Sequence, residues 1–590
     1  MIQKSPIRSR LAPPSVPKRT ARRSPRIAAD KEPPQKGEPV LRFVPLGGME
    51  EIGRNCSFFE YKNEIIIIDV GIQFPEEETP GIDYIIPNIT YLETKKQNIR
   101  GIILTHGHYD HIAAIHYLIE KLGNPIIFTA PFTRAMVEKR HEEFTNAPKL
   151  RFEVVKDGSR AQISEHFSAD FFSVEHTIPE ALGFILNTPA GKMASLGDFR
   201  LDIGHDGEPQ NLGVFERLGK ENIHSLFVDA TNAEFDGYSI SERVVEEEIE
   251  KLMKGARGRV IVGSFASLVD RLLEIIKIAD KLGRKVAVNG RSMITNLEIA
   301  KNMGFLKERK EQMIRLEDIN KYKDDKILLL TTGSQGESNA GLMRIVRGEH
   351  RIVKLKQTDT VIFSSSVVPG NERSVQALQD NIARQVDEVY NSKLLDIHSS
   401  GHAQGDDIRL VLKLIKPKFT VPIHSYFYKR KAVIKRAIDA GLNPKSVVFM
   451  DNGQVAKLTE DSFTVTSEKV PATYVMVDGL GVGDVEEVVL RDRVHLSKEG
   501  MVVVIVTAER RSGRLVKNPD IISRGFTYLK NQQELLEEIR RRVRGIMSRL
   551  PSYQEVESDY IKTLIRDQVG QFLYNKTKRR PMILPVVIEV

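Results

Sequence analysis

The chain has 590 residues and a hydrophobic content of 41%, which is enough for two to four domains with sizeable cores. Its one cysteine, Cys56, excludes a disulfide framework and a cysteine-based zinc cage, and it predicts a reducing, cytoplasmic compartment. No apolar run approaches the roughly 20 residues that span a bilayer, and the N-terminus lacks the apolar core of a signal peptide, so we expect no membrane role.

The formal net charge of +8 is concentrated at the N-terminus. Residues 1–37 contain ten Lys and Arg, two acidic residues and seven prolines, so their net charge equals that of the whole chain. We predict a disordered, basic, proline-rich tail over residues 1–38. Three interpretations of this tail stay open: a solubilising segment, an RNA tether that acts by counterion release, and a transit peptide, which the prolines disfavour.

From Leu41 onward, short apolar runs alternate with amphipathic stretches, which is typical of layered α/β packing. The run 64–68 predicts a buried strand that ends at Asp69, and the run 99–105 predicts another strand. A helical pattern covers residues 112–122. The turn between this strand and this helix is therefore fixed at residues 106–111.

That turn holds four potential metal ligands, His106, His108, Asp110 and His111. A strand-to-helix turn directs successive side chains into one cleft, so these spacings can serve two metal ions, and imidazole nitrogens with a carboxylate suit zinc-like ions. The alternative, a solvated loop, fits poorly because three of the 14 histidines fall within six positions. Further candidates follow apolar runs: His176, Asp198 and His424.

The second half of the chain continues the α/β pattern. Residues 239–242 have the spacing of a capping box and predict a helix to about Lys254. Strand-like runs at 259–263, 285–289 and 327–330 alternate with helical patterns and predict a parallel sheet. The polar stretch 456–473 is interpreted as a linker, and residues 474–590 as a small α+β domain with a helix at 532–550 and a terminal strand at 582–590.

Taken in chain order, these residues resemble the motifs of the metallo-β-lactamase superfamily and, within its β-CASP nuclease branch, those of the ribonuclease J family. Asp69, the 106–111 block, His176 and Asp198 match the superfamily motifs, and the β-CASP motifs are matched by Asp229, His402 and His424. Three longer blocks, 332–337, 363–372 and 477–484, are also similar to ribonuclease J. Tyr109 departs from the family, which commonly has Glu there.

The resemblance implies an α/β fold: a metallo-β-lactamase αββα sandwich, an inserted β-CASP domain with a parallel sheet flanked by helices, and a small α+β C-terminal domain. The expected boundaries are 39–240 and 403–455 for the two parts of the sandwich, 241–402 for the insert, 456–473 for the linker and 474–590 for the last domain.

The resemblance also implies a site with two divalent metal ions per subunit, Zn²⁺ by preference or Mn²⁺ as the alternative. One ion would be held by His106, His108 and His176, the other by Asp110, His111 and His424, with Asp198 bridging and Asp69 orienting a ligand from behind. Asp110 and His402 would be catalytic, with Asp229 poising His402 as the acid. The residues expected to contact the phosphate of the RNA are Ser267, His398, Ser400 and His402.

The function implied is a ribonuclease of RNA maturation and mRNA decay, with 5′-to-3′ exonuclease activity that favours 5′-monophosphate ends of single-stranded RNA, and with endonuclease activity. The family implies a homodimer or homotetramer and RNA-degradation partners. Two alternatives remain: a β-CASP nuclease that acts mainly on DNA, and an RNA-binding scaffold with low activity.

Overall fold

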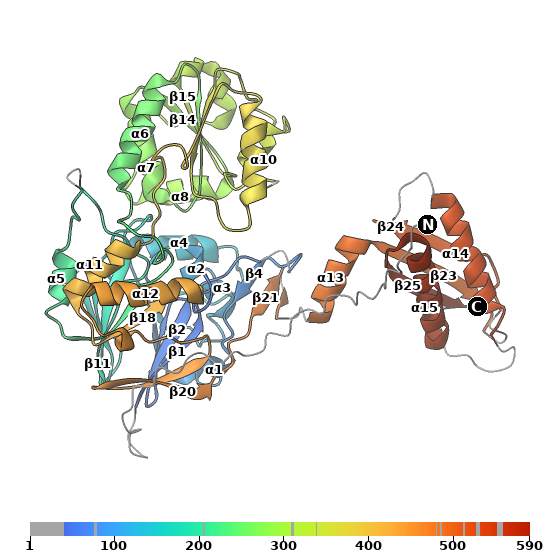
Figure 1. Cartoon of the computed structure of the whole chain (residues 1–590), viewed down its shortest axis with the longest axis horizontal. Coiled ribbons are helices and arrows are strands. Elements are labelled where there is room, and N and C mark those ends of the chain that lie inside the picture. Colours follow the sequence, from blue (N-terminus) through green and yellow to red (C-terminus); the bar gives the residue numbers. More distant parts are fainter. Residues whose placement is uncertain are drawn as a thin grey trace, which may run out of the picture.

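The computed structural model describes residues 40–75, 79–204, 207–307, 312–337, 339–479, 481–483, 487–510, 512, 514–526, 532–550 and 558–590. The expected tail at 1–38 lies outside the described residues. Figure 1 shows a sandwich unit with an insert unit above it, and a third unit to one side that follows helix α13 (Glu487–Glu499). Among the helices of these ranges, none has the length and apolarity that a membrane span requires.

Two facing sheets form the sandwich unit. One has eight strands in the order β20-β19-β1-β2-β3-β5-β6-β7, and the other has six in the order β18-β12-β11-β10-β9-β8. Rings such as Phe43, Phe59 and Phe227 pack together between the sheets. The strands are β1 (Leu41–Gly47), β2 (Cys56–Tyr61), β3 (Glu64–Ile68), β5 (Ile99–Ile103), β6 (Ile126–Thr129), β7 (Arg151–Val154), β8 (Arg160–Gln162), β9 (Ser168–Ser173), β10 (Leu182–Thr188), β11 (Gly191–Ser195), β12 (Ile223–Asp229), β18 (Phe419–Ile423), β19 (Gln454–Thr459) and β20 (Ser462–Lys469).

Helices cover the outer faces of both sheets, which confirms the expected αββα sandwich. Apolar residues of one helix before β5 and of the helices that follow β5 and β6 pack with the outer side of the eight-stranded sheet, whereas three helices pack on the six-stranded sheet. The first group is α1 (Thr90–Glu93), α2 (Tyr109–Ile112), α3 (Ile115–Leu118) and α4 (Pro131–His141); the second is α5 (Gly213–Leu218), α11 (Gly405–Ile415) and α12 (Phe427–Asp439).

The insert is a five-stranded parallel sheet in the order β14-β15-β13-β16-β17, with helices on both faces as expected. Helices α6, α7 and α8 pack on one face and α9 and α10 on the other. The elements are α6 (Glu242–Gly255), β13 (Val260–Ser264), α7 (Val269–Lys281), β14 (Lys285–Asn289), α8 (Arg291–Asn302), β15 (Ile327–Thr331), α9 (Gly341–Val346), β16 (Thr360–Ser364), α10 (Glu372–Ala383) and β17 (Glu388–Asn391).

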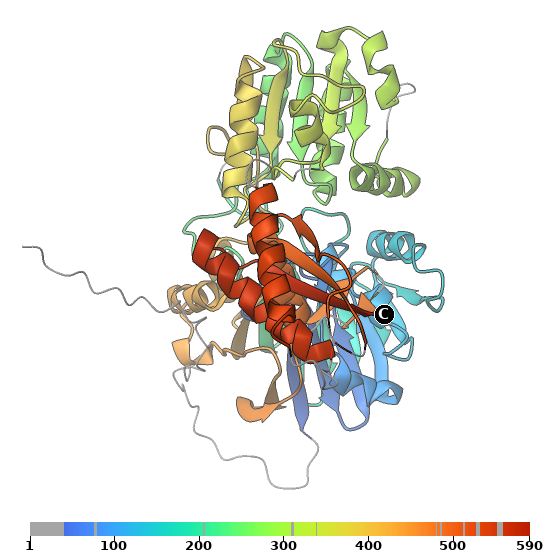
Figure 2. The same cartoon turned by 90° about the vertical axis from the view of Figure 1, so that its right-hand side faces the viewer.

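The third unit has one sheet and two long helices. Strand β23 (Met501–Ala508) lies between β24 (Asp520–Arg524) and β25 (Met582–Glu589), and apolar side chains of α14 (Gln532–Met547) and α15 (Ser558–Thr577) complete its core. Figure 2 looks onto this unit and shows both helices in front of the sandwich, with the insert above.

Three expectations about local structure need correction. The expected linker at 456–473 is wrong for most of its length, because β19 and β20 form a hairpin that extends the eight-stranded sheet, with Leu41 opposite Leu458. Polar residues give this hairpin the composition of a linker, although four of its apolar residues are buried: Val455, Ala456, Leu458 and Phe463. The C-terminal domain was expected to start at 474, but β21 (Val475–Asp478) pairs with β4 (Tyr84–Ile86) and β22 (Gly481–Val482).

The helix expected over 112–122 is instead divided into α2 and α3. The backbone N–H of Ala114 donates to the carbonyl of Val70, at 2.9 Å, rather than to the helix itself. This bond fixes the start of the helical segment against the strand end at Asp69, and it holds the preceding turn in place.

Candidate metal centre

The candidate residues meet at one edge of the two facing sheets because each follows the end of a strand. Asp69 follows β3, the 106–111 turn follows β5, Asp198 follows β11, Asp229 ends β12, and His424 follows β18. Asp69 and His424 have φ angles of 55° and 56°. Left-handed backbone is costly for residues other than glycine, and such strain is typical of functional sites.

Three imidazoles form the first cluster. The Nδ1 atom of His108 lies 3.1 Å from Nε2 of His106 and 3.0 Å from Nε2 of His176. Asp198 completes this group, with Oδ2 3.7 Å from Nε2 of His106. Burial lowers the pKa of all three histidines, so their rings are neutral at pH 7 and their lone pairs are available to a metal ion.

The second cluster combines two carboxylates with two imidazoles: Asp110, Asp198, His111 and His424. His424 lies 3.1 Å from Oδ2 of Asp110 and 3.2 Å from Oδ1 of Asp198, and Nε2 of His111 lies 3.3 Å from Oδ2 of Asp198. Burial disfavours charge on His111, but the surrounding carboxylates outweigh it and raise its pKa to about 10. The same balance raises the pKa of His424 well above its usual range. This concentration of negative charge attracts a cation.

Asp198 belongs to both clusters and is 2% exposed. Two adjacent nitrogen and oxygen donor sets that share one carboxylate fit a pair of divalent ions. The chemistry of the donors therefore suits the implied metals without any change of residue type.

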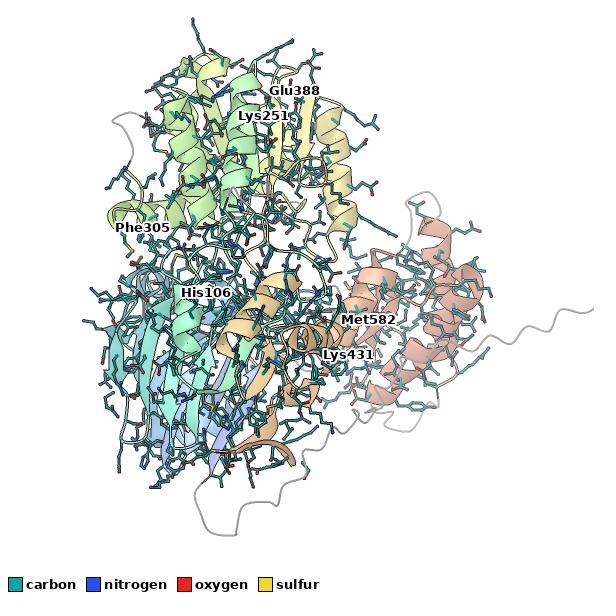
Figure 3. The ribbon with its side chains drawn as sticks, turned by 60° about the vertical axis from the view of Figure 1, so that its left-hand side comes forward. His106, Lys251, Phe305, Glu388, Lys431 and Met582 are labelled. Atoms are coloured by element: carbon teal, nitrogen blue, oxygen red, sulfur yellow. The ribbon has the colours of Figure 1, made fainter. Side chains whose placement is uncertain are left out.

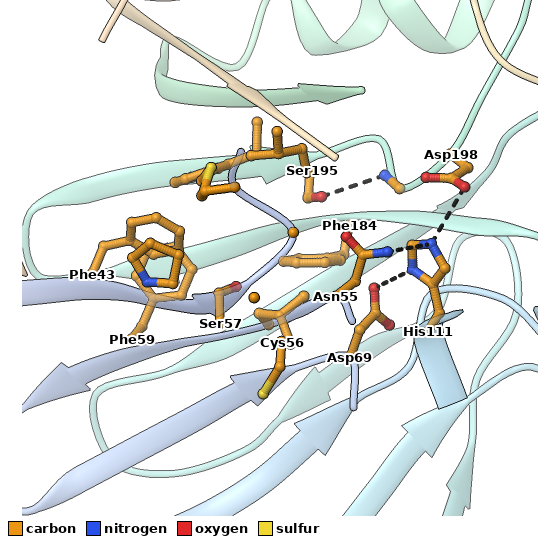
Figure 4. A pocket seen from close by; sticks show the side chains of 18 residues that line it. Phe43, Asn55, Cys56, Ser57, Phe59, Asp69, His111, Phe184, Ser195 and Asp198 are labelled. Atoms are coloured by element: carbon orange, nitrogen blue, oxygen red, sulfur yellow. Dashed lines mark hydrogen bonds and ion pairs between the residues drawn. The ribbon is translucent and has the colours of Figure 1, made fainter. Parts of the chain in front are cut away.

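Neighbouring groups fix the orientation of these imidazoles from behind. Nδ1 of His111 lies 2.8 Å from Oδ2 of Asp69, whose Oδ1 accepts the backbone N–H of Thr105 at 2.8 Å. His176 donates from Nδ1 to the carbonyl of Gly401 at 2.7 Å. Figure 4 shows Asn55, Asp69 and Asp198 around His111, beside an internal cavity of about 50 Å³. Outer contacts of this kind set the tautomer and angle of ligand rings.

His402 and Asp229 form a pair that adjoins the clusters, because they make a third group of possible ligands with Asp198 and His424. Nδ1 of His402 lies 2.7 Å from Oδ2 of Asp229, which is fully buried. The other carboxylate oxygen accepts two hydrogen bonds from Thr231, at 2.9 and 2.7 Å. Burial opposes charge on His402, but Asp229 outweighs it and raises the pKa of His402. The pair therefore presents a partly exposed imidazole, whose charged form Asp229 favours, next to the candidate metal ligands.

Of the four residues expected at the phosphate, Ser400 and His402 contact each other directly. Ser400 accepts the backbone N–H of His402 at 3.2 Å and the side chain of Asn232 at 2.8 Å. Ser267 is exposed, and its carbonyl lies 3.3 Å from Nε2 of His108. Nδ1 of His398 lies 3.5 Å from Nη1 of Arg271.

Arg271 is a buried residue near this segment that no sequence motif indicated. Its guanidinium is 2% exposed, pairs with Glu242, and donates to the hydroxyl of Ser364 at 3.1 Å and to the carbonyl of Ser399 at 3.3 Å. Burial and this cation lower the pKa of His398 to about 3. An arginine near the start of an amphipathic helix is typical of an exposed position, so the local sequence pattern does not predict that Arg271 is buried.

The two units meet around these residues. Figure 3 shows His106 in the sandwich unit, directly below the insert, and Phe305 at the junction of the two. The ring of Phe305 packs edge-on against Phe132 of the sandwich, with centroids 5.7 Å apart. A cleft of about 850 Å³ opens beside His176, and residues of both units line it: Glu175, His176, Arg200, Asp202, Ile203, Gly204, Gln210, Asn211, Ser241, Glu242, Arg243, Glu246, Asp270 and Glu274.

Comparison with known families divides the chain in three. Residues 50–219 match the model of the metallo-beta-lactamase superfamily, residues 257–382 that of the ribonuclease J beta-CASP domain, and residues 488–590 that of the ribonuclease J C-terminal domain.

Curated relatives match over almost the whole chain. This chain is 36% identical over 543 residues to Ribonuclease J 1 of Streptococcus pyogenes, and the alignment covers 92% of this chain and 96% of the relative. Ribonuclease J2 of Bacillus subtilis is 32% identical, with 94% of this chain and 100% of the relative covered. Ribonuclease J of Corynebacterium glutamicum is 35% identical, with 94% of this chain and 77% of the relative covered.

A solved structure is also similar: a protein of unknown function from Enterococcus faecalis, at a TM-score of 0.51 and 16% identity, covering 71% of this chain and all of that one. At that identity the likeness shows the fold alone.

Proposed function

This chain belongs to the ribonuclease J family, and we propose from that premise that it hydrolyses single-stranded RNA, both from 5′-monophosphate ends and internally. As a member, it is a metal-dependent hydrolase that acts on RNA. The observation that carries the proposal is the pair of His and Asp clusters that share Asp198, with the His402–Asp229 pair beside them.

We propose that His106, His108 and His176 hold one divalent ion and that Asp110, His111 and His424 hold the other, with Asp198 between them. When bound, such ions supply an activated water and neutralise the charge that develops on the phosphodiester. The support is the donor chemistry, in which three imidazoles join Asp198 in one cluster and two imidazoles join Asp110 and Asp198 in the other. The contact of 2.8 Å between Asp69 and Nδ1 of His111 supports a role for Asp69 in orienting that ring.

The chain's own contribution to bond cleavage is a proton. Hydrolysis leaves a 3′ oxygen that is a poor leaving group unless it is protonated, so an acid is needed on that side of the phosphorus. His402 is the candidate, because Asp229 raises the pKa of its imidazole and Thr231 bonds the carboxylate of Asp229. Reprotonation of His402 from solvent is supported by its side chain being 23% exposed.

Preference for a 5′-monophosphate needs donors for a compact dianion. We propose that Ser267, Ser400, His398 and His402 supply them, and we add Arg271 as the cation behind them. Arg271 reaches Ser364 and the carbonyl of Ser399, the residue before Ser400, so its charge lies directly behind this segment.

The test is a digest of RNA labelled at its 3′ or 5′ end, prepared with either a 5′-monophosphate or a 5′-triphosphate. The proposal predicts mononucleotides from the monophosphate RNA and none with Asp110→Ala. Internal fragments that do not depend on the 5′ group would leave the metal site standing but contradict the phosphate assignment. Faster cleavage of a matched single-stranded DNA would contradict the assignment of RNA as the substrate.

A further inference from the structure

Two sequence blocks that take no part in the metal centre line one cavity in the insert. The cavity has a volume of about 370 Å³ and lies beyond the carboxyl ends of β15, β16 and β17. Ser334 belongs to the block 332–337, and five lining residues belong to the block 363–372. The full lining is Ser334, Phe363, Ser365, Ser366, Val367, Glu372, Val375, Gln376, Gln379, Asn391, Ser392 and Lys393.

Two nearly buried serines line this cavity. Ser334 is 2% exposed and Ser365 is 6% exposed, and neither hydroxyl makes a hydrogen bond to a residue of the described ranges. Both hydroxyls can therefore bond to polar groups of a ligand that enters the cavity.

The walls of the cavity are fixed by the protein itself. The side-chain amide of Gln335 donates to the carbonyl of Ser366 and accepts the backbone N–H of Val368, both at 2.8 Å. The hydroxyl of Ser392 donates to the carbonyl of Ser365 at 3.3 Å. Because these bonds tie the strand-end loops together, a ligand would find its contacts already in place.

Two consecutive residues connect the cavity with the proposed phosphate site. Ser364 bonds Arg271, which lies beside His398, whereas the next residue, Ser365, lines the cavity. The carboxyl edge of this parallel sheet faces the sandwich, since the N–H of Asp270, which follows β13, donates to the carbonyl of Thr177. Ligands of open parallel sheets bind at this edge.

We propose that this cavity binds one nucleotide of the RNA strand other than the nucleotide being removed, an inference that rests on the proposed function. Hydroxyls and amides recognise the polar edges of a base and the ribose hydroxyls, and Phe363 and Val375 offer apolar contact. Exposed Lys393 suits a backbone phosphate. The one acid, Glu372, accepts the N–H of Gly370 at 2.9 Å, and a lone exposed carboxylate does not make a metal site.

Binding energy gained here is remote from the reacting bond, so it tightens the hold on long RNA and leaves a dinucleotide unaffected. Gln376→Trp and Lys393→Ala test this, because both residues are exposed and line the cavity. Lys326→Ala is the matched control, since Lys326 is exposed at the opposite, amino end of β15.

The experiment measures fluorescence anisotropy of the full chain with a 5′-monophosphate RNA of about 12 nucleotides in a chelator, so that no cleavage occurs. Both cavity variants are expected to bind about fivefold or more weakly, with the control unchanged. With metal supplied, all four proteins should hydrolyse a 5′-phosphorylated dinucleotide at the same rate. Circular dichroism confirms that each variant is folded.

Equal RNA affinity in all four proteins would overturn the inference. If calorimetry with AMP then showed binding to the wild type and none to Gln376→Trp, the ligand would be a free nucleotide and not the RNA strand. If none of the four proteins hydrolysed the dinucleotide but the cavity variants still bound RNA more weakly, the proposed function would be contradicted. The assignment of the cavity as an RNA-binding site would then still hold.

Discussion

Replacing His402 by Ala separates proton transfer from metal binding. The imidazole contacts Asp229 at 2.7 Å and lies outside the two clusters proposed to hold the metals. A positioned general acid accelerates a reaction by roughly 10²–10⁴-fold, which corresponds to about 3–5 kcal/mol of barrier. We expect the single-turnover rate on 5′-monophosphate RNA to fall by that factor, while the metal content by mass spectrometry stays that of the wild type.

A change of leaving group isolates the proton. In an RNA with sulfur in place of the 3′ bridging oxygen, the leaving group departs as a thiolate and needs no acid. His402→Ala should therefore cleave this RNA at close to the wild-type rate. Asp229→Asn should lower the pKa of His402, because the carboxylate is the group that raises it, and should move the basic limb of the rate profile to lower pH. An equal loss of rate on the oxygen and sulfur RNAs, or a loss of metal in His402→Ala, would refute this reasoning.

Three further predictions concern the junction of the two units. Burial, followed by the negative charge of Glu242, raises the pKa of Asp270 from 3.8 to about 7. Between these two pH values the native carboxyl holds a proton that the unfolded chain has released, so the free energy of unfolding falls as the pH rises. Asp270→Asn should remove this fall, which amounts to at most about 4 kcal/mol, in denaturant titrations at pH 4 and pH 8. Ser241 caps α6 by accepting the N–H of Arg243 at 3.3 Å, so Ser241→Ala should cost about 1 kcal/mol of unfolding free energy by the same titration, and an unchanged midpoint would contradict that role. Arg271→Lys should reduce the preference for 5′-monophosphate over 5′-hydroxyl RNA by about tenfold in kcat/KM, and a retained preference would remove Arg271 from the phosphate site.

The candidate metal residues could be predicted from the sequence because each depends on local structure. A buried apolar run followed by a polar ligand, as at Asp69 or at the 106–111 turn, indicates a strand end, and the ends of adjacent strands meet at one sheet edge. The parallel sheet of the insert was equally visible, since its strands are short apolar runs that alternate with helical patterns.

What the sequence could not reveal depends on tertiary contacts. The hairpin β19–β20 was mistaken for a linker because only its pairing with β1 distinguishes its polar outer face from a loop. Arg271 became relevant only when its burial against Ser364 and His398 was known. The cavity beneath Ser334 and Ser365 likewise joins residues 31 positions apart, and no spacing rule connects them.

The most direct test of the central claim is a metal and activity assay on Asp198→Ala. Asp198 is buried and lies in both clusters, so its loss should disrupt both sites at once. The account predicts about two divalent ions per wild-type chain, loss of RNA cleavage on chelation, recovery with zinc or manganese, and neither full metal content nor cleavage in Asp198→Ala. Cleavage of RNA that survives chelation, or an Asp198→Ala protein with wild-type metal content and rate, would contradict it.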